Sequence, residues 1–326
     1  MRSTFFCWAV FSAGTLAIPT HVRDIRGLNF RSTFDNGTSS TCNGTFSRVS
    51  AQEWVDGSNP GWNLGNTLDA TPTEGDWGNA PVVPSTFDDV KNAGFKSVRL
   101  PTTWAYHFIT GSPTWEVDPA WLQRVSDVVD MVTERDMYVL VNVHHDSWIW
   151  ADVTQPNANY TMIEEKFQRL WEQIGEKLAC KSSRLAFEPI NEPPGTTAAH
   201  AAELTRLENI FIQALQTSGG FNSQRVVTLN GLREDSITTS EFFVRPTNIT
   251  NPWAIQYHYY SPCKSTTLQS TTHRVDNSQT ITSLPHGVRP SGALTQTRQP
   301  SREILQTSGV TLQMFHYSSG NGLFHL

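Results

Sequence analysis

The chain has 326 residues, which suits one large domain and is hardly enough for two. Its formal net charge is −6 and only 17% of its residues are charged, so neither a nucleic-acid-binding surface nor a polybasic membrane patch is indicated. We therefore expect no nucleic-acid partner and no membrane partner. We also expect a monomer.

The first 17 residues, MRSTFFCWAVFSAGTLA, combine one arginine, an apolar run too short for a membrane span, and small residues that end at Ala17. This layout predicts a secretory signal peptide over residues 1–17. N-x-S/T sequons, the acceptors of N-glycosylation, agree with that route. They lie at Asn36, Asn43, Asn159 and Asn248. We expect a secreted, extracellular glycoprotein.

Three cysteines remain once Cys7 leaves with the signal peptide: Cys42, Cys180 and Cys263. An oxidising compartment allows one disulfide among them, and the sequence does not say which pair forms it. Residues 18–50 are rich in Ser, Thr, Asn and Gly, so they are expected to form a flexible arm. The ordered domain is expected to cover residues 51–263.

Short apolar runs of strand type alternate with helical patterns through this domain. The runs cover residues 61–66, 97–101, 138–145, 184–192, 225–231 and 254–260. Strands that are apolar on both faces and separated by helices indicate a parallel sheet covered by helices. A doubly wound open sheet is the alternative architecture, but no glycine-rich phosphate loop follows the first run.

Polar side chains gather where each of these runs ends. They are Asn66, Arg99, His144 with His145, Asn191 with Glu192, Asn230, and His258 with Tyr260. In a (β/α)₈ barrel the C-terminal ends of the strands form the active-site face, so one location accounts for all of them. We therefore expect a (β/α)₈ barrel.

The composition changes after Cys263, where Ser, Thr, Gln and Pro replace the apolar runs. Such a segment buries too little apolar surface to offset its ordering entropy. Residues 264–326 are therefore expected to form an atypical, disordered tail, foreign to the fold. The barrel is expected to be incomplete, with strands one to six present and strands seven and eight missing.

Glu192 ends the segment LAFEPINEP at the mouth of the fourth strand. A partly desolvated carboxyl there stays protonated near neutral pH, as a general acid requires, and Asn191 can hydrogen-bond a substrate hydroxyl. The alternative for Glu192 is a helix cap or a surface ion pair. Arg99 can orient a carboxylate bidentately at the same mouth, or can form a structural salt bridge.

Histidines at barrel strand ends can ligate zinc, so His144, His145 and His258 raise the question of a metal site. The sequence has no H-x-H or H-E-x-x-H spacing and no evident carboxylate ligand on a later strand. These histidines suit contacts with sugar hydroxyls and orientation of carboxylates better. We expect no metal and no cofactor.

Five motifs in this order, GWNLGNTLDATPTEGDWGN, SVRLPTTWAYH, YVLVNVHHD, FEPINEP and YHYYSP, resemble glycoside hydrolase family five over residues 50–263. The most similar branch is its endo-β-1,4-glucanases, cellulases of which some also cleave xyloglucan or mixed-linkage glucan. The resemblance implies a retaining glycosidase whose partner is a β-glucan polysaccharide or oligosaccharide.

The resemblance also implies roles for individual residues. Glu192 matches the acid/base, and Asn191 matches its neighbour that binds the 2-hydroxyl. Arg99 matches the arginine that keeps the nucleophile ionised, and His144 matches the first of a histidine pair. His258 and Tyr260 match the sixth-strand pair beside the carboxylates. The expected substrate-binding residues are Asn66, His145, Trp104, Trp148 and Trp150.

One motif departs from the family pattern. Retaining enzymes need a second carboxylate about 5 to 5.5 Å from the first, which in the family lies on strand seven in a Gly-Glu-aromatic-Gly motif. Only Asp276 and Glu303 are acidic after Tyr260, and neither ends a strand-like run. The nucleophile is therefore unknown. The alternatives to a β-1,4-glucanase are a non-catalytic carbohydrate-binding relic, a metal-dependent barrel hydrolase, or a member directed at mannan or xyloglucan.

Overall fold

The computed structural model describes residues 42–258 and 311–315, all of which belong to one compact unit, Ser39–Leu326. The expected signal peptide, the arm before Cys42 and most of the tail lie outside the described residues. Tyr260, Cys263, Asp276 and Glu303 also lie outside them, so the structure does not test these assignments.

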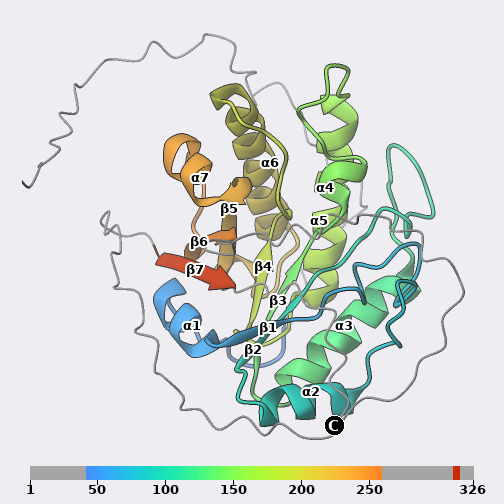
Figure 1. Ribbon diagram of the computed structural model, residues 1–326, viewed down its shortest axis with the longest axis vertical. Helices are drawn as coiled ribbons and strands as arrows, with labels where there is room; N and C mark the ends of the chain where they lie inside the picture. Colours follow the sequence, from blue (N-terminus) through green and yellow to red (C-terminus); the bar gives the residue numbers. More distant parts are fainter. Residues whose placement is uncertain (1–41, 259–310, 316–326) are drawn as a thin grey trace, which may run out of the picture. The chain divides into compact units, whose positions relative to one another are not determined.

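The described strands form one sheet in which every neighbouring pair is parallel and the spatial order equals the chain order (Figure 1). The strands are β1 (Gly61–Asn63), β2 (Ser97–Leu100), β3 (Tyr138–Asn142), β4 (Leu185–Glu188), β5 (Val227–Asp235), β6 (Trp253–His258) and β7 (Thr311–Phe315). The first six strands confirm the six runs expected from the sequence.

Strand β7 differs from that expectation. It pairs in parallel with β6 over its whole length, with Ala254 opposite Thr311 and His258 opposite Phe315. The sequence predicts no strand in this part of the tail, because its composition offers few apolar residues. Five residues of backbone pairing on the edge of an existing sheet need no long apolar run.

Helices connect the strands and pack on one another along the outside of the sheet, α2 on α3, α3 on α5 and α5 on α6 (Figure 1). They are α1 (Ala51–Ser58), α2 (Pro84–Asn92), α3 (Pro119–Thr133), α4 (Asp146–Ile149), α5 (Tyr160–Leu178), α6 (Ala198–Thr217), the 3₁₀ helix η2 (Asn222–Gln224) and α7 (Ser236–Phe242). Within the described residues, none of these helices has the length and apolarity needed to span a bilayer. The fold is an incomplete (β/α)₈ barrel, as expected.

Helix α3 shows how local sequence sets these elements. The Asp118 side chain accepts a hydrogen bond from the Ala120 N–H, and Pro119 occupies the first helical position, where its missing N–H costs nothing. Val125, Val129 and the other valines of this helix repeat at helical spacing and are buried against the sheet. Strand β2 is buried at all four positions, because helices cover one face of the sheet and side chains fill the other.

A disulfide between Cys42 and Cys180 fixes the chain just before the domain. The bond closes a loop with a sequence separation of 138 residues, and restricting the unfolded chain in this way stabilises a protein by about 2 to 4 kcal/mol. Phe46 also stacks on Phe221, with ring centroids 5.0 Å apart. The expectation of a flexible arm up to residue 50 is therefore wrong for Cys42 to Ser50, which the sequence could not show without the disulfide pairing.

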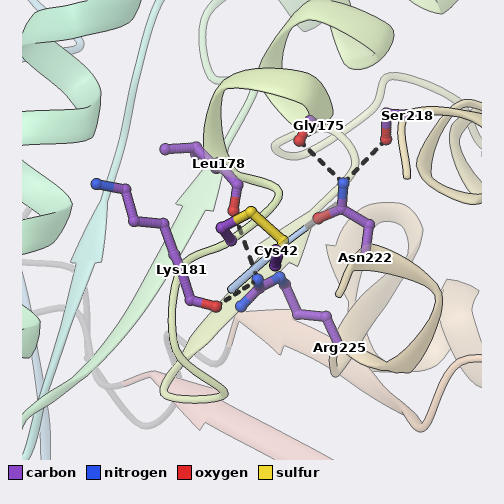
Figure 2. Close-up of a disulfide and its surroundings, with 8 residues drawn as sticks. Cys42, Gly175, Leu178, Lys181, Ser218, Asn222 and Arg225 are labelled. Atoms are coloured by element: carbon purple, nitrogen blue, oxygen red, sulfur yellow. Dashed lines mark hydrogen bonds between the residues drawn. A yellow bond between two sulfur atoms is a disulfide. The ribbon is translucent and has the colours of Figure 1, made fainter. Parts of the chain in front are cut away.

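Buried polar side chains support the end of α5 beside this disulfide (Figure 2). Arg225 is fully buried and donates hydrogen bonds to the carbonyl oxygens of Lys181 and Leu178, at 2.8 and 3.5 Å. Asn222 donates to the Gly175 carbonyl at 2.9 Å. Burial lowers the pKa of Arg225 to about 9, so the guanidinium remains charged at neutral pH and donates to carbonyl oxygens at the end of the helix.

Candidate active site

Charged side chains converge at the carboxyl ends of the strands, from β2 through β6. Arg99 from β2 and Glu188 from β4 form the centre, and both are fully buried. The Arg99 Nε donates to Glu188 Oε2 at 2.8 Å, and its Nη2 donates to Oε1 at 2.5 Å. This bidentate geometry is the strongest arrangement of such a pair. Arg99 therefore binds a carboxylate bidentately, and among the described residues that carboxylate is Glu188. This contact fits both the orienting role and the structural salt bridge that the sequence left open.

Amide side chains complete the hydrogen bonding of this pair. Asn142 at the end of β3 donates to Glu188 Oε1 at 2.9 Å, and Gln256 from β6 donates to Oε2 at 2.8 Å. Asn191 accepts from Arg99 Nη2 at 2.8 Å. Because each charge has several partners, the pair is fully hydrogen-bonded without contact with water. Arg99, Glu188, Asn142, Gln256 and Asn191 thus form one buried, hydrogen-bonded layer, here called the charged floor, beneath the more exposed side chains of the site.

Glu192 lies above this floor, after the turn that follows β4. Its backbone has a φ of 41°, and the preceding residue is fixed by a 2.9 Å hydrogen bond from the Asn191 N–H to the Val143 carbonyl. The Glu192 side chain is 27% exposed, and its Oε1 lies 2.6 Å from His258 Nδ1. Glu192 is thus a partly exposed carboxyl in contact with His258. Its role as the acid stays a prediction.

A cavity of about 480 Å³ opens over Glu192. That volume lies within the range of small-molecule sites. Trp148, at 48% exposed, provides an aromatic face on its wall. The cavity-lining residues are Trp148, Glu192, Pro194, Gly195, Arg233, Asp235 and His258. A carboxyl, an imidazole and an exposed indole around one opening can bind a polyhydroxylated ligand.

His258 joins Glu192 to a second carboxylate. Its Nε2 lies 2.8 Å from Glu234 Oε2, and the ligand atoms of Glu192, Glu234 and His258 all lie within 4.8 Å of one another. Burial alone would lower the pKa of His258, but the charge of Glu234 and the hydrogen bond with Glu192 outweigh it and raise the pKa to about 9. His258 is therefore a cation at neutral pH.

The two histidines after β3 differ from each other. His144 is buried, and its Nδ1 lies 3.0 Å from Asn142 Nδ2. Burial and the positive charge of Arg99 hold the pKa of His144 well below its ordinary value, so this ring is neutral. The His145 Nε2 lies 3.7 Å from Asp69 Oδ2. The His145 ring stacks on Trp148, with centroids 5.0 Å apart.

Two tryptophans that were expected to stack on sugars, Trp104 and Trp150, contact other protein groups instead. Trp104 has no exposed surface and its indole N–H donates to the Asn142 carbonyl at 3.1 Å, so the expectation that it stacks on sugars is wrong. A tryptophan that follows a strand end can pack in the core as readily as it can face the substrate site, and the sequence does not distinguish the two. Trp150 is partly buried; it donates to Asp146 at 2.6 Å, and the Lys166 Nζ lies 4.5 Å from the centroid of its ring.

The structure places Asn66 in the loop after β1, exposed and with a φ of 59°. The asparagine of this segment that reaches the charged floor is Asn63, which accepts from Arg99 Nη1 at 3.1 Å. The strand ends three residues before Asn66, so the sequence run extended past the real strand end.

Two groups of side chains have the donor types for a metal ion, within the described residues. The first is Asp69, His144 and His145, and the second is Glu192, Glu234 and His258. In the second group the carboxylates lie on different nitrogens of the His258 ring. A single ion cannot replace both contacts, so this arrangement favours a shared proton over a metal.

The comparison with family models decides the family. The model of the cellulase family, glycosyl hydrolase family 5, matches residues 57–289, which is more than half of the chain. The chain belongs to glycosyl hydrolase family 5. This confirms the resemblance on which the residue assignments depend.

Endoglucanases and a xyloglucanase are among the proteins that this chain resembles. Endoglucanase A of Paenibacillus barcinonensis is 32% identical over 229 residues, which are 62% of this chain and 56% of that protein. A tri-modular subfamily 4 endo-β-1,4-glucanase from Bacillus licheniformis, complexed with cellotetraose, is 40% identical with a TM-score of 0.60, over 66% of this chain and 40% of that one. A family 5 xyloglucanase from Paenibacillus pabuli is 33% identical with a TM-score of 0.60, over 64% of each chain.

Two acidic residues at this site, Glu188 and Glu234, are not among those predicted from the sequence. Glu188 precedes Glu192 in the same segment, and only its position on β4 shows that it points into the charged floor. Glu234 follows a register shift of β5, where Arg233 and Glu234 have φ values of 58° and 50°. No sequence period marks such a bulge. The signal that could have found both is their acidic character beside an apolar strand.

Proposed function

We propose that this chain acts on β-1,4-linked glucans as a retaining glycoside hydrolase, with Glu192 as the acid that protonates the departing glycosidic oxygen. The observation that carries the proposal is the position of Glu192, half-buried on the wall of the 480 Å³ cavity and 2.6 Å from His258. The endo-β-1,4-glucanase from Bacillus licheniformis, complexed with cellotetraose, supports this substrate class.

The other residues take supporting roles in this proposal. Asn191 is fixed by the hydrogen bond from Arg99 to its side chain and by its own backbone hydrogen bond to Val143, the residue after β3. In this proposal its amide nitrogen binds a sugar hydroxyl. Trp148 stacks on a sugar ring, because its exposed face lines the same cavity as Glu192. Arg99 holds Glu188 in place beneath the site.

Binding without hydrolysis is the second candidate function. One observation favours it: the sequence has no Gly-Glu-aromatic-Gly motif after residue 260, where the family pattern places the nucleophile. A retaining mechanism needs that second carboxylate at the anomeric carbon. Stacking on Trp148 and hydrogen bonding to Asn191 do not depend on it.

Release of reducing ends from soluble glucans separates the two functions. We expect release from carboxymethylcellulose and xyloglucan and less from mannan. Pulldown on insoluble cellulose, measured on the same preparation, reports binding alone. If the protein is retained on cellulose but releases no reducing ends from any of the three polymers, its function is binding and not hydrolysis. If it neither binds cellulose nor releases reducing ends, the proposed substrate class is contradicted.

We also infer that the protein is secreted. Residues 1–17 have the layout of a signal peptide, and the disulfide Cys42–Cys180 is typical of an oxidising compartment. The sequon residues Asn43, Asn159 and Asn248 are exposed. N-terminal sequencing of protein collected from the culture medium is expected to begin after Ala17, and a protein that stays in the cells with Met1 intact would refute this inference.

A further inference from the structure

Glu234 and Glu192 lie on either side of one imidazole ring. Glu192 Oε1 is 2.6 Å from His258 Nδ1, and Glu234 Oε2 is 2.8 Å from His258 Nε2. The other carboxylate oxygen of Glu234 accepts a hydrogen bond from the Asn230 amide. Glu234 has no exposed surface, so it lies behind the ring while Glu192 faces the cavity.

The backbone around Glu234 is held in an unfavourable conformation. Arg233 and Glu234 both have positive φ values, at 58° and 50°, in the segment where the pairing of β5 with β6 shifts register between Asn230 and Asp235. Non-glycine residues adopt this region only when the surrounding structure enforces it, and such residues are frequent at functional sites. The bulge brings Glu234 into contact with His258. His258 lies on β6, where it pairs with Asp235 of β5.

We propose that Glu234 is a positioning residue of this site: it holds the Nε2 side of His258 and thereby determines how one proton is divided between His258 Nδ1 and Glu192 Oε1. No assigned role of the family-five motifs involves Glu234. Its part in catalysis rests on the proposed function, whereas its effect on His258 does not.

The charges around the ring agree with this role. The charge of Glu234 and the hydrogen bond with Glu192 both favour the imidazolium form of His258, against its burial. Arg99 opposes that form, but its charge is largely compensated by Glu188. His144 also faces this site, and it is neutral because of its burial and of Arg99. Burial raises the pKa of Glu234 and the His258 cation opposes that rise. The carboxylate and the imidazolium therefore stabilise each other.

The proton transfer conserves charge. When the proton leaves His258 Nδ1 for Glu192 Oε1, the imidazolium becomes neutral imidazole and the Glu192 carboxylate becomes a carboxylic acid. The second ring proton stays on Nε2, facing Glu234. Glu192 can then give its proton to a leaving-group oxygen and regain one along the same contact, as an acid/base must.

The test measures the protonation of His258 directly. The ring signals of ¹⁵N-labelled full-length protein are followed by NMR against pH, with the His258 signals identified by their loss in His258→Gln. In the unaltered chain we expect His258 to be doubly protonated at pH 7.5. Glu234→Gln removes the charge and keeps the shape, so the proton affinity of His258 is expected to fall at least about tenfold, one pH unit.

Two further variants make the result specific. Glu234→Asp keeps the charge and is expected to restore most of the lost proton affinity. Glu241→Gln, the same replacement on an exposed residue of the neighbouring helix α7, is expected to leave His258 unchanged. An unchanged His258 in Glu234→Gln would overturn the proposal. If that variant does not fold, a His258 in the unaltered chain that titrates near its ordinary value of about 6.5 would overturn it equally.

A kinetic measurement then addresses the part that rests on the proposed function. The shared proton is lost above the pKa of His258, so Glu234→Gln is expected to move the alkaline limb of kcat/KM to lower pH. A chain that hydrolyses no glucan leaves the NMR result intact and refutes only the proposed function.

Discussion

Replacing Arg99 with methionine is expected to lower the free energy of unfolding by about 3 to 5 kcal/mol. Methionine matches the stem of the arginine but leaves the Glu188 carboxylate buried without its cation. The amides of Asn142 and Gln256 still donate to Glu188, but they do not balance its charge. Urea unfolding followed by tryptophan fluorescence measures the loss.

The double variant Arg99→Met with Glu188→Leu tests the cause. It removes both charges, and is expected to recover most of the stability, because the cost arises from one unpaired buried ion. Arg135→Met is the matched control: its partner Asp88 is 55% exposed, so the carboxylate keeps its water and the change is expected to be far smaller. Equal losses in the two single variants, or no recovery in the double variant, would contradict this account.

The sequence predicted the six strands because a parallel sheet covered by helices needs apolar residues on both faces of each strand. The four buried residues of β2 and of β4 are examples. It also predicted that the strand ends meet, since the carboxyl ends of parallel strands share one edge. Arg99, His144, Glu192 and His258 do meet there. Their catalytic roles remain predictions.

The pairing of these residues was beyond the sequence. Glu188 and Glu192 are four residues apart in one segment, and the turn between them decides that the first is fully buried under Arg99 and the second is half-exposed beside His258. Glu234 depends on a bulge that breaks the strand period. Trp104 and Trp148 both follow strand ends, and only the packing of their neighbours shows that one is core and the other exposed. Backbone direction after a strand end is set by loop contacts that no local pattern records.

Replacing Glu192 with glutamine is expected to reduce kcat on cello-oligosaccharides by about 10² to 10⁴, with little change in KM. Glutamine has the same size and can still contact His258, but it has no proton to deliver to the glycosidic oxygen. The measurement is the release of cellobiose, as initial rates over a range of substrate concentrations. Glu241→Gln is the control for the chemical change, because it removes an exposed carboxylate on α7.

The leaving group shows whether proton donation is what the variant has lost. An aryl β-cellobioside with a strongly acidic phenol departs without protonation, so Glu192→Gln is expected to lose far less in bond cleavage on that substrate than on cellotetraose. A general acid predicts this difference, whereas a residue that only shapes the cavity predicts equal losses. Equal losses on the two substrates would remove Glu192 from the acid role, even if its position beside Trp148 and His258 still contributes to binding.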